Sequence, residues 1–332
     1  MLAALGFAAA AAAIRLLLPD PLYLYAPPRS EKLALLARDR EATVAAFGTS
    51  RVHNGFLPSA FDTAFAGAPY AVHSLNLALF GGSQTEQRAL AREFLARLSP
   101  GGTEPAFCIA ILELNAGLNF ELVNLFHPRS VNLYDLDTVL FAASFSDASV
   151  GRVREIARAG VALVAGLLHY SGLGMLSEAL FQRPRGGGAE AERGFVNEPR
   201  DEAGRRGVEA AFRDRPQTPV VATMSILPGN RALVAELRAA AARRNVHFFY
   251  LVSPSLDDLY RYPEYPAAIE VSGTPVPILN LARPDRYPQL FRPELWRDPG
   301  HLDTEGAALF SRILAEEVKA RLGPLPAAAC GE

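Results

Sequence analysis

The chain has 332 residues, of which half are hydrophobic and a fifth are charged, and its formal net charge at pH 7 is −2. This composition excludes a disordered protein and predicts one large globular domain or two small ones. The nearly balanced charge provides no broad basic field, so we expect no nucleic-acid partner.

The first 20 residues form a predicted hydrophobic helix or signal anchor. Residues 1–18 are apolar except for Arg15, and Pro19-Asp20-Pro21 ends any helix. Eighteen helical residues reach about 27 Å, slightly less than a bilayer core. An uncleaved membrane anchor, a cleaved export signal and a buried helix all remain open. The first two interpretations export the domain, although basic residues follow the segment rather than precede it, contrary to the positive-inside rule.

Residues 21–41 are a predicted linker and short helix, and apolar runs then alternate with amphipathic helical patterns. The runs of strand length lie at 43–47, 70–79, 106–114, 219–226 and 246–252. Helical patterns follow at about 83–98, after 228, and at 304–321. This alternation predicts a three-layer α/β/α sandwich with a parallel five-stranded sheet over residues 42–321, followed by a tail at 322–332.

Residues 120–218 interrupt the alternation and are predicted to be a helical insertion. The apolar stretch 161–181 contains His169, Ser171, Ser177 and Glu178, which favours a buried or lid-forming helix pair over a membrane span. Residues 184–207 combine three consecutive glycines with many charges, which predicts a mobile loop.

Several small or polar residues follow the carboxyl ends of the predicted strands. They are Ser50, Gly81, Gly82, Asn115 and Ser253. Because ligands of open α/β sheets bind beyond the carboxyl ends of the strands, we expect the functional site at this edge.

A serine, a histidine and an aspartate in this arrangement can support nucleophilic catalysis. Ser50 ends the first strand, and Asp298 and His301 flank a Pro-Gly turn before the last helix. A hydroxyl needs a base to take its proton, and a carboxylate can orient a histidine for that role. Taken singly, each part has a plain structural interpretation. Ser50 can be an ordinary loop serine, and Asp298 can be a helix-capping residue beside a surface histidine. Together they predict a catalytic triad.

The segments that carry these residues resemble the SGNH (GDSL-like) hydrolase superfamily. Residues 47–51 (FGTSR) resemble its first block, 76–83 (NLALFGGS) its second, and 298–302 (DPGHL) with Gly306 its last. Thr49 stands where the family has an aspartate. Residues 113–117 (ELNAG) stand where the third block has Gly-x-Asn-Asp.

The resemblance implies a flavodoxin-like fold and acyl transfer through Ser50, His301 and Asp298, with no cofactor and no metal. Backbone N–H groups of Ser50 and of Gly81 or Gly82, with the Asn115 side chain, would form the oxyanion hole. Asn115 as a loop cap is the alternative.

The likeness is greatest to membrane-anchored, exported bacterial members linked to cell-surface polysaccharide acylation. It implies an esterase or O-acyltransferase acting on acyl, chiefly acetyl, esters of carbohydrate, anchored to the inner membrane through residues 1–18 and facing the periplasm or exterior. A catalytically silent domain that binds polysaccharide or acts as a scaffold is the alternative, and a cytoplasmic esterase is a third reading.

Two further residues are candidate substrate contacts. Arg51 follows the nucleophile and could bind an anionic substrate or anchor the loop through an ion pair. Trp296 could line a sugar site or pack the turn before Asp298.

Overall fold

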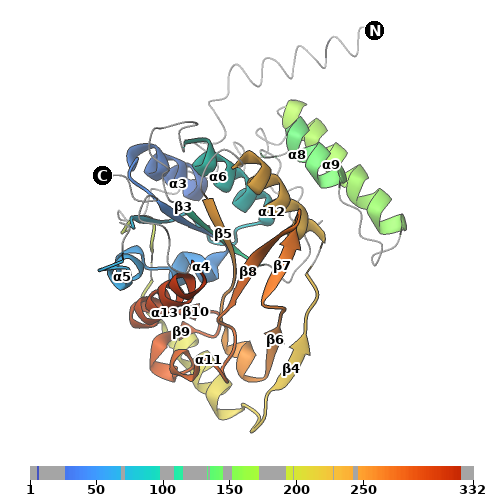
Figure 1. The fold of residues 1–332 in the computed structure, drawn as a ribbon. Helices are drawn as coiled ribbons and strands as arrows, with labels where there is room; N and C mark the ends of the chain where they lie inside the picture. Colours follow the sequence, from blue (N-terminus) through green and yellow to red (C-terminus); the bar gives the residue numbers. More distant parts are fainter. Residues whose placement is uncertain are drawn as a thin grey trace.

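The computed structural model describes most of the chain between residues 27 and 322. The described residues are 6, 27–68, 72–97, 108–114, 133, 135–144, 152–171, 192–196, 198–226, 228–241 and 246–322. Within them the protein is an α/β structure built around a mixed six-stranded sheet (Figure 1).

Five neighbouring strands of this sheet are parallel, and the sixth, at one edge, is antiparallel. In spatial order the strands are β2 (Ser74–Asn76), β1 (Val44–Phe47), β3 (Cys108–Glu113), β5 (Val246–Val252), β8 (Thr274–Asn280) and β7 (Ala268–Val271). Every residue of β1, β2 and β3 is buried, which explains why these strands are continuous apolar runs in the sequence.

The expectation of a purely parallel five-stranded sheet is met only in part. Besides the antiparallel β7, the predicted strand at 219–226 lies elsewhere: β4 (Val220–Thr223) pairs with β6 (Arg261–Glu264) in a separate two-stranded sheet. The fifth parallel strand of the main sheet is instead β8. The sequence does not predict this strand, because Pro275 and Pro277 are unusual in a strand. Both prolines lie in the part of β8 that pairs with β7, and only Ile278–Asn280 pairs with β5.

Helices cover both faces of the sheet, because alternate residues of each strand point to opposite sides. Val44 and Ala46 belong to one core cluster, and Ala45 and Phe47 belong to the other. The first face carries α4 (Ser50–Gly55), α5 (Pro58–Ala64) and α13 (Thr304–Leu322); the second carries α3 (Pro27–Arg38), α6 (Gln84–Arg97) and α12 (Pro228–Ala240).

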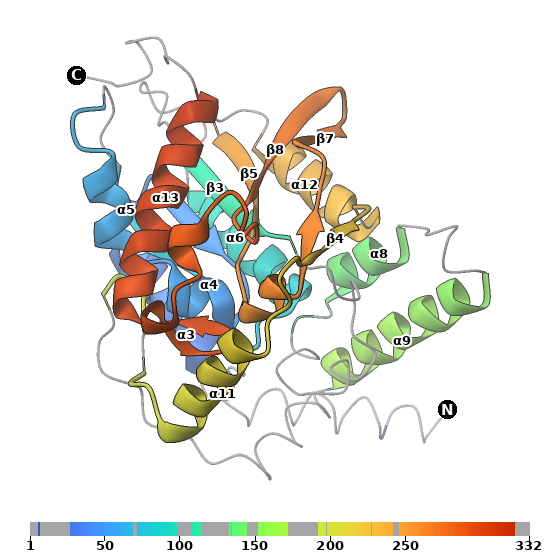
Figure 2. The same cartoon turned by 90° about the horizontal axis from the view of Figure 1, so that it is seen from below.

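The predicted insertion at 120–218 contains two unrelated structural parts. The helices α8 (Leu136–Ser144) and α9 (Arg152–Ser171) pack together at one side of the molecule (Figures 1 and 2). The helix α11 (Glu202–Arg213) packs against β9 (Trp296–Asp298) and therefore begins inside the predicted loop 184–207. The remainder of the stretch 161–181 beyond α9 lies outside the described residues.

Short elements connect β5 to α13. Besides β6 to β9, they are the 3₁₀ helices Leu256–Leu259, Pro288–Leu290 and Pro293–Leu295 and the strand β10 (His301–Leu302), which pairs with β9. In the described ranges no helix is both long enough and apolar enough to cross a membrane. Of the predicted anchor, only Gly6 is described, so residues 1–18 otherwise lie outside these ranges, as does the tail beyond Leu322.

Candidate active site

Ser50 is the first residue of α4, directly after the sharp turn that leaves β1. Thr49 caps the helix, and its hydroxyl accepts a hydrogen bond from the Arg51 N–H at 3.4 Å. A Cβ at position 48 would lie 2.6 Å from a Val52 methyl group and 2.7 Å from a Glu113 oxygen, so this turn requires glycine. The turn leaves the Ser50 side chain partly exposed at the carboxyl edge of the sheet.

The turn and the helix are held by two buried residues from neighbouring strands. Glu113, at the end of β3, accepts a hydrogen bond from the Thr49 N–H at 2.6 Å. The Asn76 amide nitrogen lies 2.7–3.1 Å from the carbonyl oxygens of Val52, His53 and Phe56. These contacts fix α4, and with it Ser50, against β2 and β3.

Asp298 and His301 lie opposite each other on a β-hairpin, not on the last helix. β9 and β10 pair antiparallel with Asp298 in register with His301, and Pro299-Gly300 forms the turn between them. Residues directly opposite in such a pair have adjacent side chains. The spacing Asp-x-x-His therefore brings a carboxylate and an imidazole together through the hairpin.

Folding brings this hairpin to Ser50, 251 residues away in the chain. The His301 Nε2 atom lies 2.8 Å from the Ser50 Oγ atom. On the other side of the ring, Nδ1 lies 2.8 and 3.0 Å from the two Asp298 carboxylate oxygens. With Nδ1–H donating to the carboxylate, Nε2 is left as the acceptor for the Ser50 hydroxyl. The three predicted catalytic residues therefore form one continuous hydrogen-bonded chain.

The Asp298 carboxylate is stabilised in its charged form. Burial opposes ionisation, but hydrogen bonds from His301, the Gly300 N–H and Arg297, together with the charge of His301, lower its pKa to about 2. The Gly300 N–H and the Arg297 Nε donate at 2.8 and 3.1 Å. Asp298 is therefore an anion at neutral pH, suited to orienting the His301 ring and stabilising its protonated form.

One of the predicted oxyanion donors is already engaged in another hydrogen bond. The Gly82 N–H donates to the Leu79 carbonyl at 2.9 Å, so it is already engaged. Gly81 is exposed, with a φ of +62°. The Ser50 N–H lies in the first turn of α4, where N–H groups have no partner within the helix. Asn115 lies outside the described residues.

The two candidate substrate contacts have different environments. Trp296 is fully buried, and its indole nitrogen donates to the Leu290 carbonyl at 2.9 Å, so it packs the core beneath β9 and does not line a sugar site. Arg51 is exposed and lines a pocket beside Ser50, where its charge acts on Asp258.

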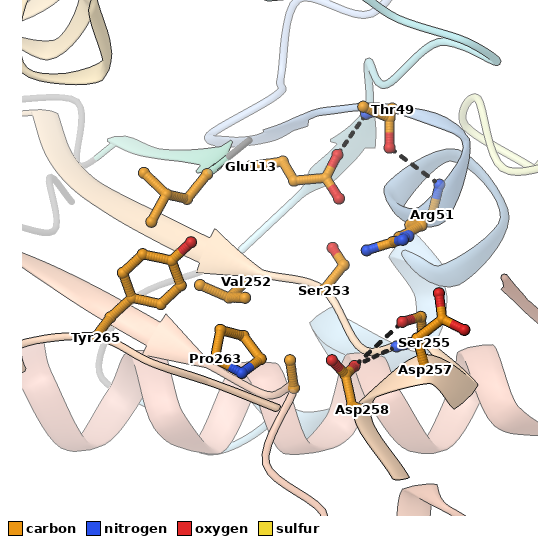
Figure 3. Close-up of a pocket in the computed structure, with 12 residues that line it drawn as sticks. Thr49, Arg51, Glu113, Val252, Ser253, Ser255, Asp257, Asp258, Pro263 and Tyr265 are labelled. Carbon is orange, nitrogen blue, oxygen red and sulfur yellow. Dashed lines mark hydrogen bonds between the residues drawn. The ribbon is translucent and has the colours of Figure 1, made fainter. Parts of the chain in front are cut away.

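The sequence predicted a functional site at this edge of the sheet, and the structure shows a pocket there. It has a volume of about 420 Å³ and lies beyond the carboxyl ends of β1, β3, β5 and β8 (Figure 3). The residues on either side of Ser50 line it, together with Glu113, Ser253 and Asp258. Ser253 was expected at this edge from its position after a strand. Asp258 gave no such signal, because it lies in a 3₁₀ turn.

Phe80 is a second residue that the sequence did not single out. Its ring stacks on the His301 imidazole with a centroid separation of 6.3 Å and an interplanar angle of 21°. The side chain is 56% exposed. Phe80 therefore covers one side of the His301 ring at the surface.

Among the residues that the structure describes, no group of three or more His, Cys, Asp or Glu side chains is arranged to hold a metal ion. No protein-family model matches this chain, and no curated protein matches its sequence.

Proposed function

We propose that this protein is a serine-dependent esterase or O-acyltransferase in which Ser50 is the nucleophile, His301 the general base and Asp298 the residue that orients it. The observation that carries the proposal is the hydrogen-bonded chain from Ser50 Oγ through His301 to Asp298. Residues that act in this way are recognised by their geometry and roles.

In the first half of the reaction, Ser50 Oγ attacks the carbonyl carbon of an ester while His301 Nε2 takes the hydroxyl proton. The ester C–O bond then breaks, and the protonated His301 gives the proton to the leaving alkoxide. The acyl group remains on Ser50 as an ester. In the second half, His301 takes a proton from water or from an acceptor hydroxyl, which attacks the acyl carbon and releases Ser50 with its proton restored.

Two backbone groups are candidates for holding the negative oxygen of the tetrahedral intermediate. They are the N–H groups of Ser50 and Gly81, since the Gly82 N–H is engaged within its own turn. Removing one such donor typically costs about 3 kcal/mol of transition-state stabilisation.

The finer fold assignment is part of the same proposal. Five parallel strands covered by helices on both faces, with the nucleophile after β1 and the Asp-His hairpin before α13, support membership of the SGNH hydrolase superfamily. The proposed substrate is an acyl ester of carbohydrate. The proposed location, which rests on residues 1–18, is the outer side of a bacterial inner membrane.

Labelling with a fluorophosphonate probe, which reacts with activated serines, tests the function. We expect the wild-type protein to be labelled and to hydrolyse p-nitrophenyl acetate, and both signals to disappear in Ser50→Ala. Ser59→Ala, a serine on α5 outside the site, is the matched control and should be labelled like wild type.

An unlabelled wild-type protein that is folded by circular dichroism would contradict catalysis. It would favour the catalytically silent domain that binds or scaffolds polysaccharide.

A further inference from the structure

Ser253 is a buried polar residue that the structure leaves unsatisfied. It follows β5, it is 4% exposed, and its hydroxyl has no hydrogen-bond partner among the described residues. The nearby Ser255 is in contrast satisfied, because it forms a reciprocal cap with Asp258. A buried hydroxyl without a partner is unfavourable, so among the described residues Ser253 is a polar group ready to bond a ligand.

The Ser253 side chain points into the pocket beside Ser50. In Figure 3 it is directed into the space between Glu113 and Arg51. A carboxylate accepts hydrogen bonds, a guanidinium donates them, and a serine hydroxyl does both. The group that fits between all three is one that both donates and accepts, which is the property of an alcohol.

We infer that this pocket, hereafter the sugar pocket, binds a neutral sugar ring of the ester or of the acyl acceptor, with ring hydroxyls bonded to Ser253, Glu113 and Arg51. The inference rests on the proposed function and specifies its substrate class. The sugar pocket has a volume of about 420 Å³, which lies within the usual range of small-molecule sites, about 300–1,000 Å³. Tyr265 at the rim offers an aromatic ring to the apolar face of a sugar.

The charges of the lining favour a neutral ring over an acidic one. Among the described lining residues, three carry carboxyl groups (Glu113, Asp257 and Asp258) and only Arg51 carries a positive charge. A uronate or a phosphorylated sugar would therefore meet more negative than positive charge, even with Asp258 protonated. Asp258 adapts to a neutral ligand, because burial raises its pKa to about 7 despite the opposing effects of Ser255 and Arg51, so that it can donate or accept.

The position of the sugar pocket fits the reaction. Thr49 and Arg51, the neighbours of Ser50, both line it. A ring held there has a hydroxyl, or the ester on that hydroxyl, next to the nucleophile. The pocket would then discriminate substrates, while the hydrogen-bonded chain of Ser50, His301 and Asp298 performs the chemistry.

Ligand-observed saturation-transfer NMR on the full-length Ser50→Ala protein tests this without requiring catalysis. The probes are methyl glucoside, methyl galactoside and methyl mannoside, with methyl glucuronide as the anionic match of the first. We expect saturation of at least one neutral glycoside, and at least fivefold less saturation of the glucuronide. Ser253→Leu, which fills the pocket, should remove the neutral signal. Thr274→Leu, an exposed site at the opposite end of β8, should keep it.

Three results would overturn the inference. They are no saturation of any neutral glycoside at tens of millimolar, equal or stronger binding of the glucuronide, and binding that persists in a folded Ser253→Leu protein. The first two need no pocket variant, so they hold even if Ser253→Leu fails to fold. The binding assay uses the Ser50→Ala protein and so does not depend on catalysis. A negative binding result therefore leaves the fluorophosphonate test of the function unaffected, and a negative fluorophosphonate result leaves the binding test valid.

Discussion

At the scale of single residues, the site depends on two aspartates with opposite electrostatic environments. Asp298 is held as an anion by three hydrogen-bond donors, with a pKa of about 2. Asp258 lines the same pocket as Thr49 and Arg51, and burial raises its pKa to about 7. The two carboxyl groups therefore have different charge at neutral pH, which suits one to orienting His301 and the other to contacting a neutral ligand.

Replacing the charged aspartate tests its orienting role. In Asp298→Asn we expect kcat for p-nitrophenyl acetate to fall by about 10³–10⁴-fold, because the amide cannot stabilise the imidazolium and selects the wrong tautomer. KM should change less than threefold. Steady-state kinetics measures both. A fall of less than tenfold in kcat would contradict the assigned role.

The second aspartate predicts a pH dependence of stability. The folded-state pKa of Asp258, about 7, lies above the unfolded value of 3.8. Between these two pH values the folded state binds a proton that the unfolded state does not. The stability of the protein therefore falls as the pH rises from about 4 to about 7. In Asp258→Asn this loss of stability should disappear. The change that the substitution causes in the free energy of unfolding should therefore be at least about 1 kcal/mol more favourable at pH 8 than at pH 4. Urea denaturation at the two pH values measures it. An equal effect at both would show that Asp258 does not titrate in this range.

At the scale of elements, the helix α4, which begins with Ser50, is positioned by a strand-end asparagine. Asn76 accepts a hydrogen bond from the Ala78 N–H at 3.1 Å, and Asn280 accepts one from the Ala282 N–H at 3.2 Å in the same way. Only Asn76 also holds the carbonyls at the end of α4, and it is fully buried. Comparing Asn76 with Asn280 therefore separates the effect of capping a strand end from the effect of supporting the helix that carries Ser50.

We expect Asn76→Ala to lower the free energy of unfolding by about 2–4 kcal/mol, because several buried carbonyls lose their donor. It should also lower kcat by more than tenfold, since α4 carries Ser50. Asn280→Ala is the matched control and should affect stability less and kcat little. The idea fails if the two variants lose kcat equally at a temperature where both are folded.

The sequence largely predicts which segments form helices and strands, but it does not predict which strands pair with one another. The Ser83–Glu86 pair forms a capping box before α6, with reciprocal hydrogen bonds of 3.0 and 3.2 Å; such a motif is visible in the sequence because it is formed within one turn. The run 219–226 does form a strand, but its valines are 60% and 47% exposed and it leaves the main sheet. Strand pairing is decided by distant residues, so a local apolar pattern does not reveal it.

At the scale of the whole molecule, one buried arginine connects the α8–α9 pair to the body. Arg88 on α6 contacts Glu236 on α12 with two nitrogens at 2.6 Å, and it also contacts Asp137 and Thr138 on α8 at 2.8 and 3.0 Å. The Arg92 side chain, one turn later, reaches the same two carboxylates but is 43% exposed. Exposed ion pairs contribute little, so Arg88 is the expected anchor.

In Arg88→Ala we predict faster amide hydrogen exchange throughout α8 and α9. We expect kcat/KM for p-nitrophenyl acetate to change less than twofold, because the hydrogen bonds of Arg88 go to α8 and α12 and not to Ser50, His301 or Asp298. Arg92→Ala should exchange like wild type. Hydrogen-exchange mass spectrometry measures the difference. Unchanged exchange in Arg88→Ala would mean that other contacts hold the helix pair.

The sequence by itself determined the α/β class, the buried strands β1, β2, β3 and β5, and the chemistry that Ser50, Asp298 and His301 could perform together. These depend on local patterns and on the properties of side chains. Only the tertiary structure decided that His301 Nε2 lies 2.8 Å from Ser50 Oγ, that Trp296 is buried, and that Ser253 points into a pocket. Those facts arise from the packing of segments up to 251 residues apart, and no local pattern encodes the relative position of such segments.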